Sequence, residues 1–349
     1  MRKAVTTFLV LMMAVATGAD LNPSPGTQPT SLIFRNADVV CSAVVTSVVP
    51  LNQNANPPGS ADTERRTLRV TVKVQDYYKF NGEKRPVLEL LYDHSPSREP
   101  PTSSPFQSGQ FVLLFLKENI GGSYTLADPY VGLTAFASIK QVRGVSDGRG
   151  LDKLQTMLSA ALVTHNREDI LSSIRLIEGL DSIDSDTSSR IEGLSHSQDP
   201  EIVLAAFAVL IKTRMPESLS RLSDYLDSHD KVDQFISLLS VGSELAQLLD
   251  SNHLKEIEHL SSSKYLSIQL GAMNALRKMK NMASVPSLLD RLDDPNHAVQ
   301  YIALITLAEI FGKFDDYAPS MYLFDQNPEH YTNLWKKWWR EQGHDRAKP

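Results

Sequence analysis

A Gly-x-Ser-x-Gly pattern is the feature of the sequence that most directly suggests catalysis. Residues 144–148 read Gly-Val-Ser-Asp-Gly, and in α/β-hydrolases this pattern places a nucleophilic serine on a sharp strand-to-helix turn, with an acid and a histidine downstream. Around Ser146, however, the apolar spacing changes from a strand-like to a helix-like period, and no doubly wound sheet is predicted. We therefore expect a turn between two domains, and we rank an esterase that uses Ser146 last among the possible functions.

A short segment rich in histidine and glutamate is the best candidate for a metal site. His253, Glu256 and His259 fall within seven residues of a predicted helix. The two histidines are six residues apart and point to different faces, so only two of these side chains could reach one ion, and two ligands do not make a tight site. We expect a solvated helix face and no metal. Three further acids are expected in an interhelical loop, because the glycine and glutamate spacing of a calcium loop is missing: Asp181, Asp184 and Asp186.

Two aromatic clusters are candidates for interaction. Trp335, Trp338 and Trp339 alternate with basic residues near the end of the chain. On a helix these rings either seal the core of the final repeat or form an exposed platform for a glycan or a protein. Tyr77 and Tyr78 form the second cluster, at the end of a predicted strand.

The overall composition excludes several classes of protein. The 349 residues are 42% hydrophobic, which suits two globular domains stabilised by buried apolar area. Lys and Arg number 35 against 41 Asp and Glu, and this net charge of −6 disfavours a nucleic-acid partner. The single cysteine, Cys41, excludes a disulfide framework, and its apolar neighbours predict a buried, unreactive thiol. The sequence has no phosphate-binding glycine loop or dinucleotide motif, and we expect no cofactor.

Residues 1–19 have the pattern of a secretory signal peptide. Arg2 and Lys3 precede an apolar run that ends in small residues, and cleavage after either Ala16 or Ala19 suits a signal peptidase. We favour a mature chain that starts at Asp20. The run is too short to span a bilayer comfortably, and no later stretch approaches ~20 apolar residues. We therefore predict an exported protein, secreted or periplasmic, that has no membrane span.

Residues 31–142 have the pattern of a small β-barrel. From Leu68 to Gln75 apolar and polar side chains alternate strictly, which predicts a strand with one buried face. Similar β-rich runs recur, separated by turn residues such as those at 52–62 and 95–104. Five or six short strands within about 110 residues are typical of a closed or nearly closed barrel.

Parts of this region resemble the netrin-like domain of tissue inhibitors of metalloproteinases. The resemblance lies in four segments that occur in the order of that family: 34–40, 78–82, 109–114 and 124–129. It implies an OB-type barrel. Inhibition in that family depends on an N-terminal cysteine that chelates the protease zinc, and on disulfides. Here Arg35 stands beside Asn36 where the family has a cysteine, so the resemblance implies the fold without the zinc chelation.

Residues 151–343 show a helical repeat. Self-alignment gives steps of 33, 33, 33 and 31 residues between five corresponding positions: Ser173, Ala206, Leu239, Ala272 and Ala303. Asp199-Pro200 and Asp294-Pro295 are expected to open two of the units, each with a capping acid and a proline at the first helical position.

The repeat units resemble HEAT or HEAT-like repeats, most closely at residues 294–307, while the unit around Leu239 is degenerate. The alternative is an irregular helical bundle. The predicted fold class is therefore multi-domain β plus α, with an OB-like (netrin-like) barrel followed by a HEAT-like α-helical solenoid.

The sequence favours an exported protein that is not an enzyme and that binds a protein partner on its helical surface, because solenoids commonly act by recognition. The alternative is an inhibitor of an extracellular hydrolase that acts through barrel loops 52–62 and 95–104.

Overall fold

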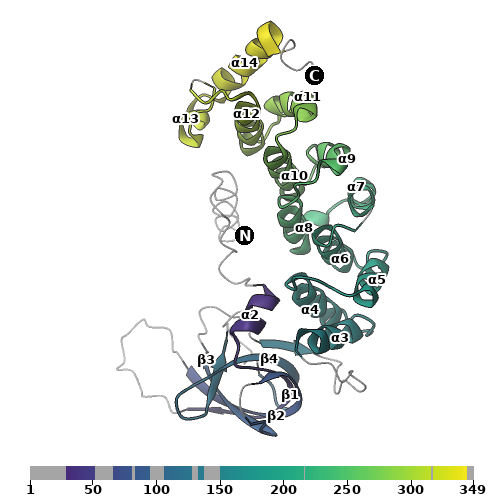
Figure 1. Cartoon of the computed structure of the whole chain (residues 1–349), viewed down its shortest axis with the longest axis vertical. Helices are drawn as coiled ribbons and strands as arrows, with labels where there is room; N and C mark the ends of the chain where they lie inside the picture. The colour runs from purple at the N-terminus through teal and green to yellow at the C-terminus, as the bar shows by residue number, and fades with distance from the viewer. Residues whose placement is uncertain are drawn as a thin grey trace. The chain divides into compact units, whose positions relative to one another are not determined.

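The computed structural model describes residues 29–51, 66–80, 83–94, 106–127, 133–136, 150–215, 217–315 and 317–343. The chain forms two compact units, one spanning Pro23–Leu194 and the other containing Ser195–Pro349. The first unit contains a β-barrel and the helices that follow it, and the second is helical (Figure 1). The predicted class of β plus α is thus confirmed.

Six strands form the sheet of the first unit: β1 (Val39–Pro50), β2 (Arg66–Phe80), β3 (Val87–His94), β4 (Phe111–Glu118), β5 (Tyr124–Leu126) and β6 (Leu133–Phe136). They lie in the order β1-β2-β3-β5-β4-β6, and β4 also pairs with β1, which closes the barrel. The β3–β5 pair is parallel and joins Leu90 to Tyr124, whereas the other pairs are antiparallel.

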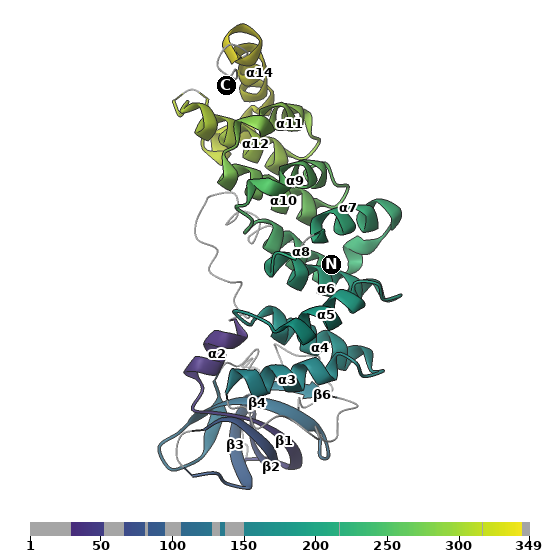
Figure 2. The ribbon, with the colours of Figure 1, turned by 45° about the vertical axis from the view of Figure 1, so that its right-hand side comes forward.

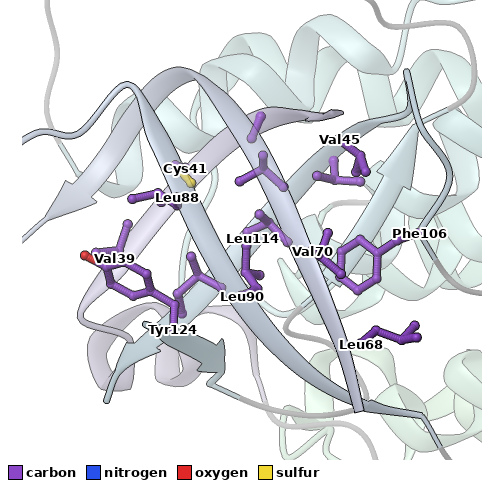
Figure 3. Packing of buried hydrophobic residues seen from close by; sticks show 14 residues of the cluster. Val39, Cys41, Val45, Leu68, Val70, Leu88, Leu90, Phe106, Leu114 and Tyr124 are labelled. Carbon is purple, nitrogen blue, oxygen red and sulfur yellow. The ribbon is translucent and has the colours of Figure 1, made fainter. Parts of the chain in front are cut away.

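The barrel core comes from alternate residues of each strand. In β2 the side chains of Leu68, Val70 and Val72 are buried, while those of Arg69 and Lys73 are exposed, which confirms the predicted alternation. Phe106, which precedes β4, and equivalent residues of the neighbouring strands complete the cluster (Figure 3): Val39, Cys41, Val45, Leu88, Leu90, Leu114 and Tyr124.

Helix α2 (Thr30–Asn36) precedes the barrel and is tied at both ends within the first unit. At its C-terminal end Lys79 Nζ donates to the carbonyls of Phe34 and Arg35, at 2.9 and 2.7 Å. Near its N-terminal end Ser31 Oγ donates to Asp181 Oδ1 at 2.7 Å, and Arg35 in the last turn of α2 pairs with the same carboxylate.

Three more helices complete the first unit: α3 (Leu151–Ala161), α4 (Arg167–Glu178) and α5 (Ser185–Leu194). Lys153 of α3 pairs with Asp76 of β2 at 2.5 Å, and α4 packs against β6 and α2. Gly179, which follows α4, allows close packing, because a Cβ there would lie 2.9 Å from that of Thr30.

The second unit is built from α-helices of 6 to 15 residues. Those with their bounds are α6 (Pro200–Lys212), α7 (Ser218–Ser228), α8 (Ser237–Leu245), α9 (Leu254–Leu260), α10 (Leu266–Met279), α11 (Val285–Asp290), α12 (His297–Phe311), α13 (Met321–Gln326) and α14 (Pro328–Trp338). Helix α6 packs on α8, α8 on α10, and α10 on α12, while α7, α9 and α11 lie against them (Figure 2). Within the described residues, no helix has both the length and the apolar character needed to cross a membrane.

The five corresponding positions of the predicted repeat fall in alternate helices. Ser173 lies in α4, Ala206 in α6, Ala272 in α10 and Ala303 in α12, all buried. Leu239 of α8 is 37% exposed. The unit around Leu239 thus differs from the others in structure as it does in sequence.

The structure confirms one of the two predicted proline-containing helix caps and contradicts the other. Asp199 caps α6 by accepting from the Glu201 N–H at 2.9 Å, and Pro200 starts the helix as predicted. The prediction for Asp294-Pro295 is wrong, since Asn296 caps α12, which begins at His297. Asp294 instead accepts a 2.5 Å hydrogen bond from Gln269 of α10, and so ties neighbouring helices together.

Helices α8 and α10 approach most closely at two glycines. A Cβ added to Gly271 would lie 2.9 Å from the carbonyl carbon of Gly242, and a Cβ added to Gly242 would lie 2.9 Å from that of Ser267. Because these contacts are with backbone atoms, no side-chain rotation relieves them.

We predict that Gly271→Ala destabilises the protein by about 2 kcal/mol, because overpacking against a backbone forces the two helices apart. The control is Gly193→Ala in α5, where an added Cβ meets no atom within 4 Å. Helix propensity should make that change neutral or stabilising by up to about 1 kcal/mol. Thermal and denaturant unfolding measure both variants, and equal stability of the two would contradict the close approach.

Candidate interaction surfaces

The tryptophan cluster closes one end of the helical unit. Trp335 and Trp338 of α14 are buried, and Trp335 Nε1 donates to the carbonyl of Tyr317 at 2.9 Å. The Lys313 ammonium lies 4.6 Å from the ring centre of Tyr317 and 4.9 Å from that of Trp338. Only Trp339 of the three tryptophans keeps a partly exposed ring. The burial of Trp335 and Trp338 corresponds to the sealing role rather than to an exposed platform.

The two predicted tyrosines lie on opposite faces of β2. Tyr78 is buried, its hydroxyl lies 3.2 Å from Ser42 Oγ, and burial raises its pKa. Tyr77 is partly exposed, and its hydroxyl donates to the carbonyl of Arg85 at 2.6 Å. Phe80 packs edge-on against the Tyr77 ring. Tyr77 therefore belongs to an accessible end of the barrel, and Tyr78 does not.

A cavity of about 240 Å³ lies beside this end of the barrel, between the start of β3 and the turn from β4 to β5. We call it the β3–β5 seam, and its lining consists of Arg85, Val87, Leu88, Glu89, Gly121, Gly122, Ser123 and Tyr124. Arg85 Nη1 donates across it to the Gly122 carbonyl at 3.3 Å. Beside the seam the Ile120 side chain is fully exposed. Nothing in the sequence pattern pointed to this cavity, because its two walls are more than 30 residues apart.

The segment with histidine and glutamate does not form a metal site among the described residues. His259 Nε2 instead lies 3.1 Å from Asp227 Oδ2, and both side chains are more than half exposed. A shallow cleft of about 240 Å³ beside them includes Ser223, Ser262 and Lys264. Ser262 Oγ donates to the backbone carbonyl of His259 at 2.7 Å. Its hydroxyl is therefore directed to the backbone and not to the imidazole.

Asp181 and Asp184 lie in the loop between α4 and α5 as predicted, whereas Asp186 lies in the first turn of α5, and each of the three has a structural partner. Asp181 binds Ser31 and Arg35 of α2. Asp184 accepts from the Thr187 N–H at 2.7 Å, and Asp186 pairs with Arg190 at 2.9 Å. These carboxylates stabilise helix α5 and its surroundings, as N-terminal acids do.

An exposed apolar residue follows each of three alternate helices of the second unit, α8, α10 and α12. Leu249 after α8, Met282 after α10 and Phe314 after α12 are 60%, 39% and 59% exposed. They are 33 and 32 residues apart, which matches the repeat. We call these three residues the apolar edge. In monomeric proteins such residues occur singly by chance, whereas a repeated set suggests a recognition surface.

Polar contacts connect the C-terminal ends of α8, α10 and α12, which the residues of the apolar edge follow. Lys278 Nζ donates to Gln247 Oε1 at 2.9 Å, which joins α10 to the end of α8. Arg277 Nη2 lies 2.6 Å from Glu309 Oε1, and Lys280 Nζ lies 3.1 Å from Glu309 Oε2, which joins α10 to α12. The C-terminal ends of the three helices therefore lie side by side.

Several predicted features lie outside the described residues: the signal peptide (1–19), the Gly-x-Ser-x-Gly segment (144–148) and the barrel loops at 52–62 and 95–104. They stay predictions. No protein-family model matches the chain, and no curated protein matches its sequence.

Cys41 provides a test of the barrel core. The thiol is completely buried, and burial raises its pKa to about 12. Since the thiolate is the reactive form, we predict that a disulfide reagent at pH 8 leaves the folded protein unlabelled and labels one thiol per chain in guanidinium. Rapid labelling of the folded protein would show that the barrel core is open to solvent.

Proposed function

We propose that this protein is an exported protein without enzymatic activity, which binds another protein on its helical unit. In this proposal the N-terminal domain is an OB-type barrel of the netrin-like kind, and the helices form a HEAT-like solenoid. The signal peptide predicted at residues 1–19 would direct the chain into the secretory pathway.

The strand order supports the OB-type assignment. Five of the six strands close the barrel in the order β1-β2-β3-β5-β4, and β6 adds to β4. A five-stranded barrel in which β1 pairs with both β2 and β4, and in which β3 meets β5 in parallel, is the arrangement expected of that fold. Arg35, at the position where the netrin-like family has a cysteine, pairs with Asp181. This ion pair joins α2 to the segment after α4.

The helix packing supports the solenoid assignment. The alternate helices α6, α8, α10 and α12 pack on one another in chain order, as in repeat proteins, where each unit contacts its neighbours. The repeated cap and core positions add to this support, since α6 begins at Pro200 and α12 at His297, with Ala206 and Ala303 at equivalent buried positions.

The single observation that carries the binding proposal is the apolar edge. Leu249, Met282 and Phe314 occupy the same place in successive units and expose apolar surface that the fold does not need for its core. Packed helices lie 8–10 Å apart, so these side chains would meet a partner at regular intervals of about 10 Å. A partner with apolar side chains at that spacing would cover them.

The proposal predicts that Leu249→Asp, Met282→Asp and Phe314→Asp together abolish capture of a partner. The mature chain from Asp20 would be immobilised and exposed to native extract, and bound proteins would be identified by mass spectrometry. The matched control is Ile236→Asp with Tyr322→Asp, since these side chains are 69% and 73% exposed and lie outside the apolar edge.

We expect the control to retain the partner and the triple variant to lose it at least tenfold, since each buried apolar anchor contributes about 1–2 kcal/mol. Thermal unfolding checks that both variants fold. Absence of any reproducible partner, or equal capture by both variants, would contradict the proposal.

A further inference from the structure

The cleft beside His259 lies between α7 and α9 of the second unit, and we call it the α7–α9 cleft. Its lining comes from two stretches of the chain, within residues 223–227 and 259–264. Its volume of about 240 Å³ is below the roughly 300–1,000 Å³ of sites for drug-sized ligands. A ligand the size of a single ring therefore fits it.

Two contacts between the segments that follow these helices hold the cleft in shape. Lys264 Nζ lies 2.6 Å from Asp230 Oδ1, and the Tyr265 hydroxyl donates to the carbonyl of His229 at 2.6 Å. Because the chain itself supplies this frame, a ligand does not have to order it, which lowers the cost of binding.

Ser223 places an unpartnered hydroxyl in the cleft. The residue is only 8% exposed, yet its Oγ makes no hydrogen bond with any described residue. Buried hydroxyls are usually hydrogen-bonded, so this exception needs an explanation. A serine hydroxyl can both donate and accept, and a bound ligand would use both capacities.

Two further serines bring hydroxyls of complementary capacity. Ser262 Oγ donates to the carbonyl of His259 at 2.7 Å, so its lone pairs remain able to accept. Ser263 Oγ accepts from the N–H of Tyr265 at 3.3 Å, so its proton remains available to donate. The lining therefore offers donors and acceptors close together, as a ligand with several hydroxyl groups requires.

The charges of the lining cancel. Asp227 and Lys264 are its acidic and basic residues, and each already has a partner in the chain, His259 and Asp230 respectively. An ionic ligand would have to compete with these contacts. A neutral ligand can instead use what they leave free, namely Asp227 Oδ1 and the remaining ammonium protons of Lys264. A ligand hydroxyl that donates to the carboxylate forms a charge-assisted hydrogen bond.

The cleft also has an apolar wall. Leu226 and Leu260 both line it, and each is 2% exposed. A pyranose ring combines a face of C–H groups with hydroxyls around its rim, so it can cover the leucines while its hydroxyls meet the polar groups. Covering apolar atoms adds a favourable contribution to binding.

We propose that the α7–α9 cleft binds one pyranose ring of a neutral sugar. The hydroxyls of the sugar contact Ser223, Asp227 and Lys264, and its C–H groups contact Leu226 and Leu260. The cleft shares no residue with the apolar edge, so this binding is independent of the proposed function.

The test is a titration of the isotopically labelled full chain with D-glucose, D-galactose and D-mannose and with their methyl glycosides, followed by amide NMR. We expect at least one of these sugars to cause saturable shifts centred on residues 223–227 and 259–264, with a Kd of about 1–10 mM, as suits a small ligand. Equal binding of the methyl glycoside identifies the end of a glycan as the ligand, whereas loss of binding on methylation identifies a free sugar.

Ser223→Ala should weaken this binding about fivefold, because one hydrogen bond is lost. It should leave thermal unfolding unchanged, because the hydroxyl has no partner among the described residues of the free protein. Asp227→Asn should weaken binding about tenfold, since the charge-assisted hydrogen bond is lost. The matched control is Ser220→Ala, at an exposed position of α7 outside the lining, which should bind as the unchanged protein does.

No saturable shift with any of these sugars up to about 100 mM, or equal binding by Ser223→Ala and Ser220→Ala, would overturn the proposal. Tighter binding of glycine or inorganic phosphate at the same amides would also overturn it, because the site would then select an ion. The triple variant of the apolar edge should bind the sugar normally, and Ser223→Ala should still capture a partner of the helical unit. Failure of the cleft is thereby distinguished from failure of the proposed function.

Discussion

The packing of the second unit depends on the contact between α8 and α10, where two glycines let the helix backbones touch directly. Gly242 and Gly271 bring two backbones to a separation that no other residue type permits. This contact fixes how far α10 slides along α8, and with it the position of Lys278 beside Gln247 at the helix ends. Leu249 and Met282 follow those ends, so the spacing of the apolar edge is a consequence of the glycine contact.

In the first unit, helix α2 is positioned by polar contacts as well as by close backbone packing. Lys79 binds the carbonyl end of α2, where a cation interacts favourably with the helix dipole, and Asp181 binds Ser31 near its beginning. The Arg35–Asp181 pair is well exposed, so its contribution to stability is small. Helix α2 is therefore positioned mainly by the Lys79 contacts and by the packing of Thr30 on Gly179.

Local periodicity in the sequence predicts much of this architecture, because burial of one face imposes the period of each element. The alternation around Val70 and the buried repeat positions Ala206, Ala272 and Ala303 are examples. Contacts between distant segments could not be predicted in this way. Asp294 resembles a helix cap, yet its carboxylate binds Gln269. The β3–β5 seam likewise arises from strand pairing, which local patterns do not encode.

Hydrogen exchange of the complex between the full chain and its captured partner tests the central claim most directly. Surface burial slows amide exchange where the partner lies. The proposed function predicts partner-dependent protection at residues 246–250, 280–284 and 312–315, the segments that carry the apolar edge. Protection confined to the barrel, with those three segments exchanging as they do in the free protein, would contradict it.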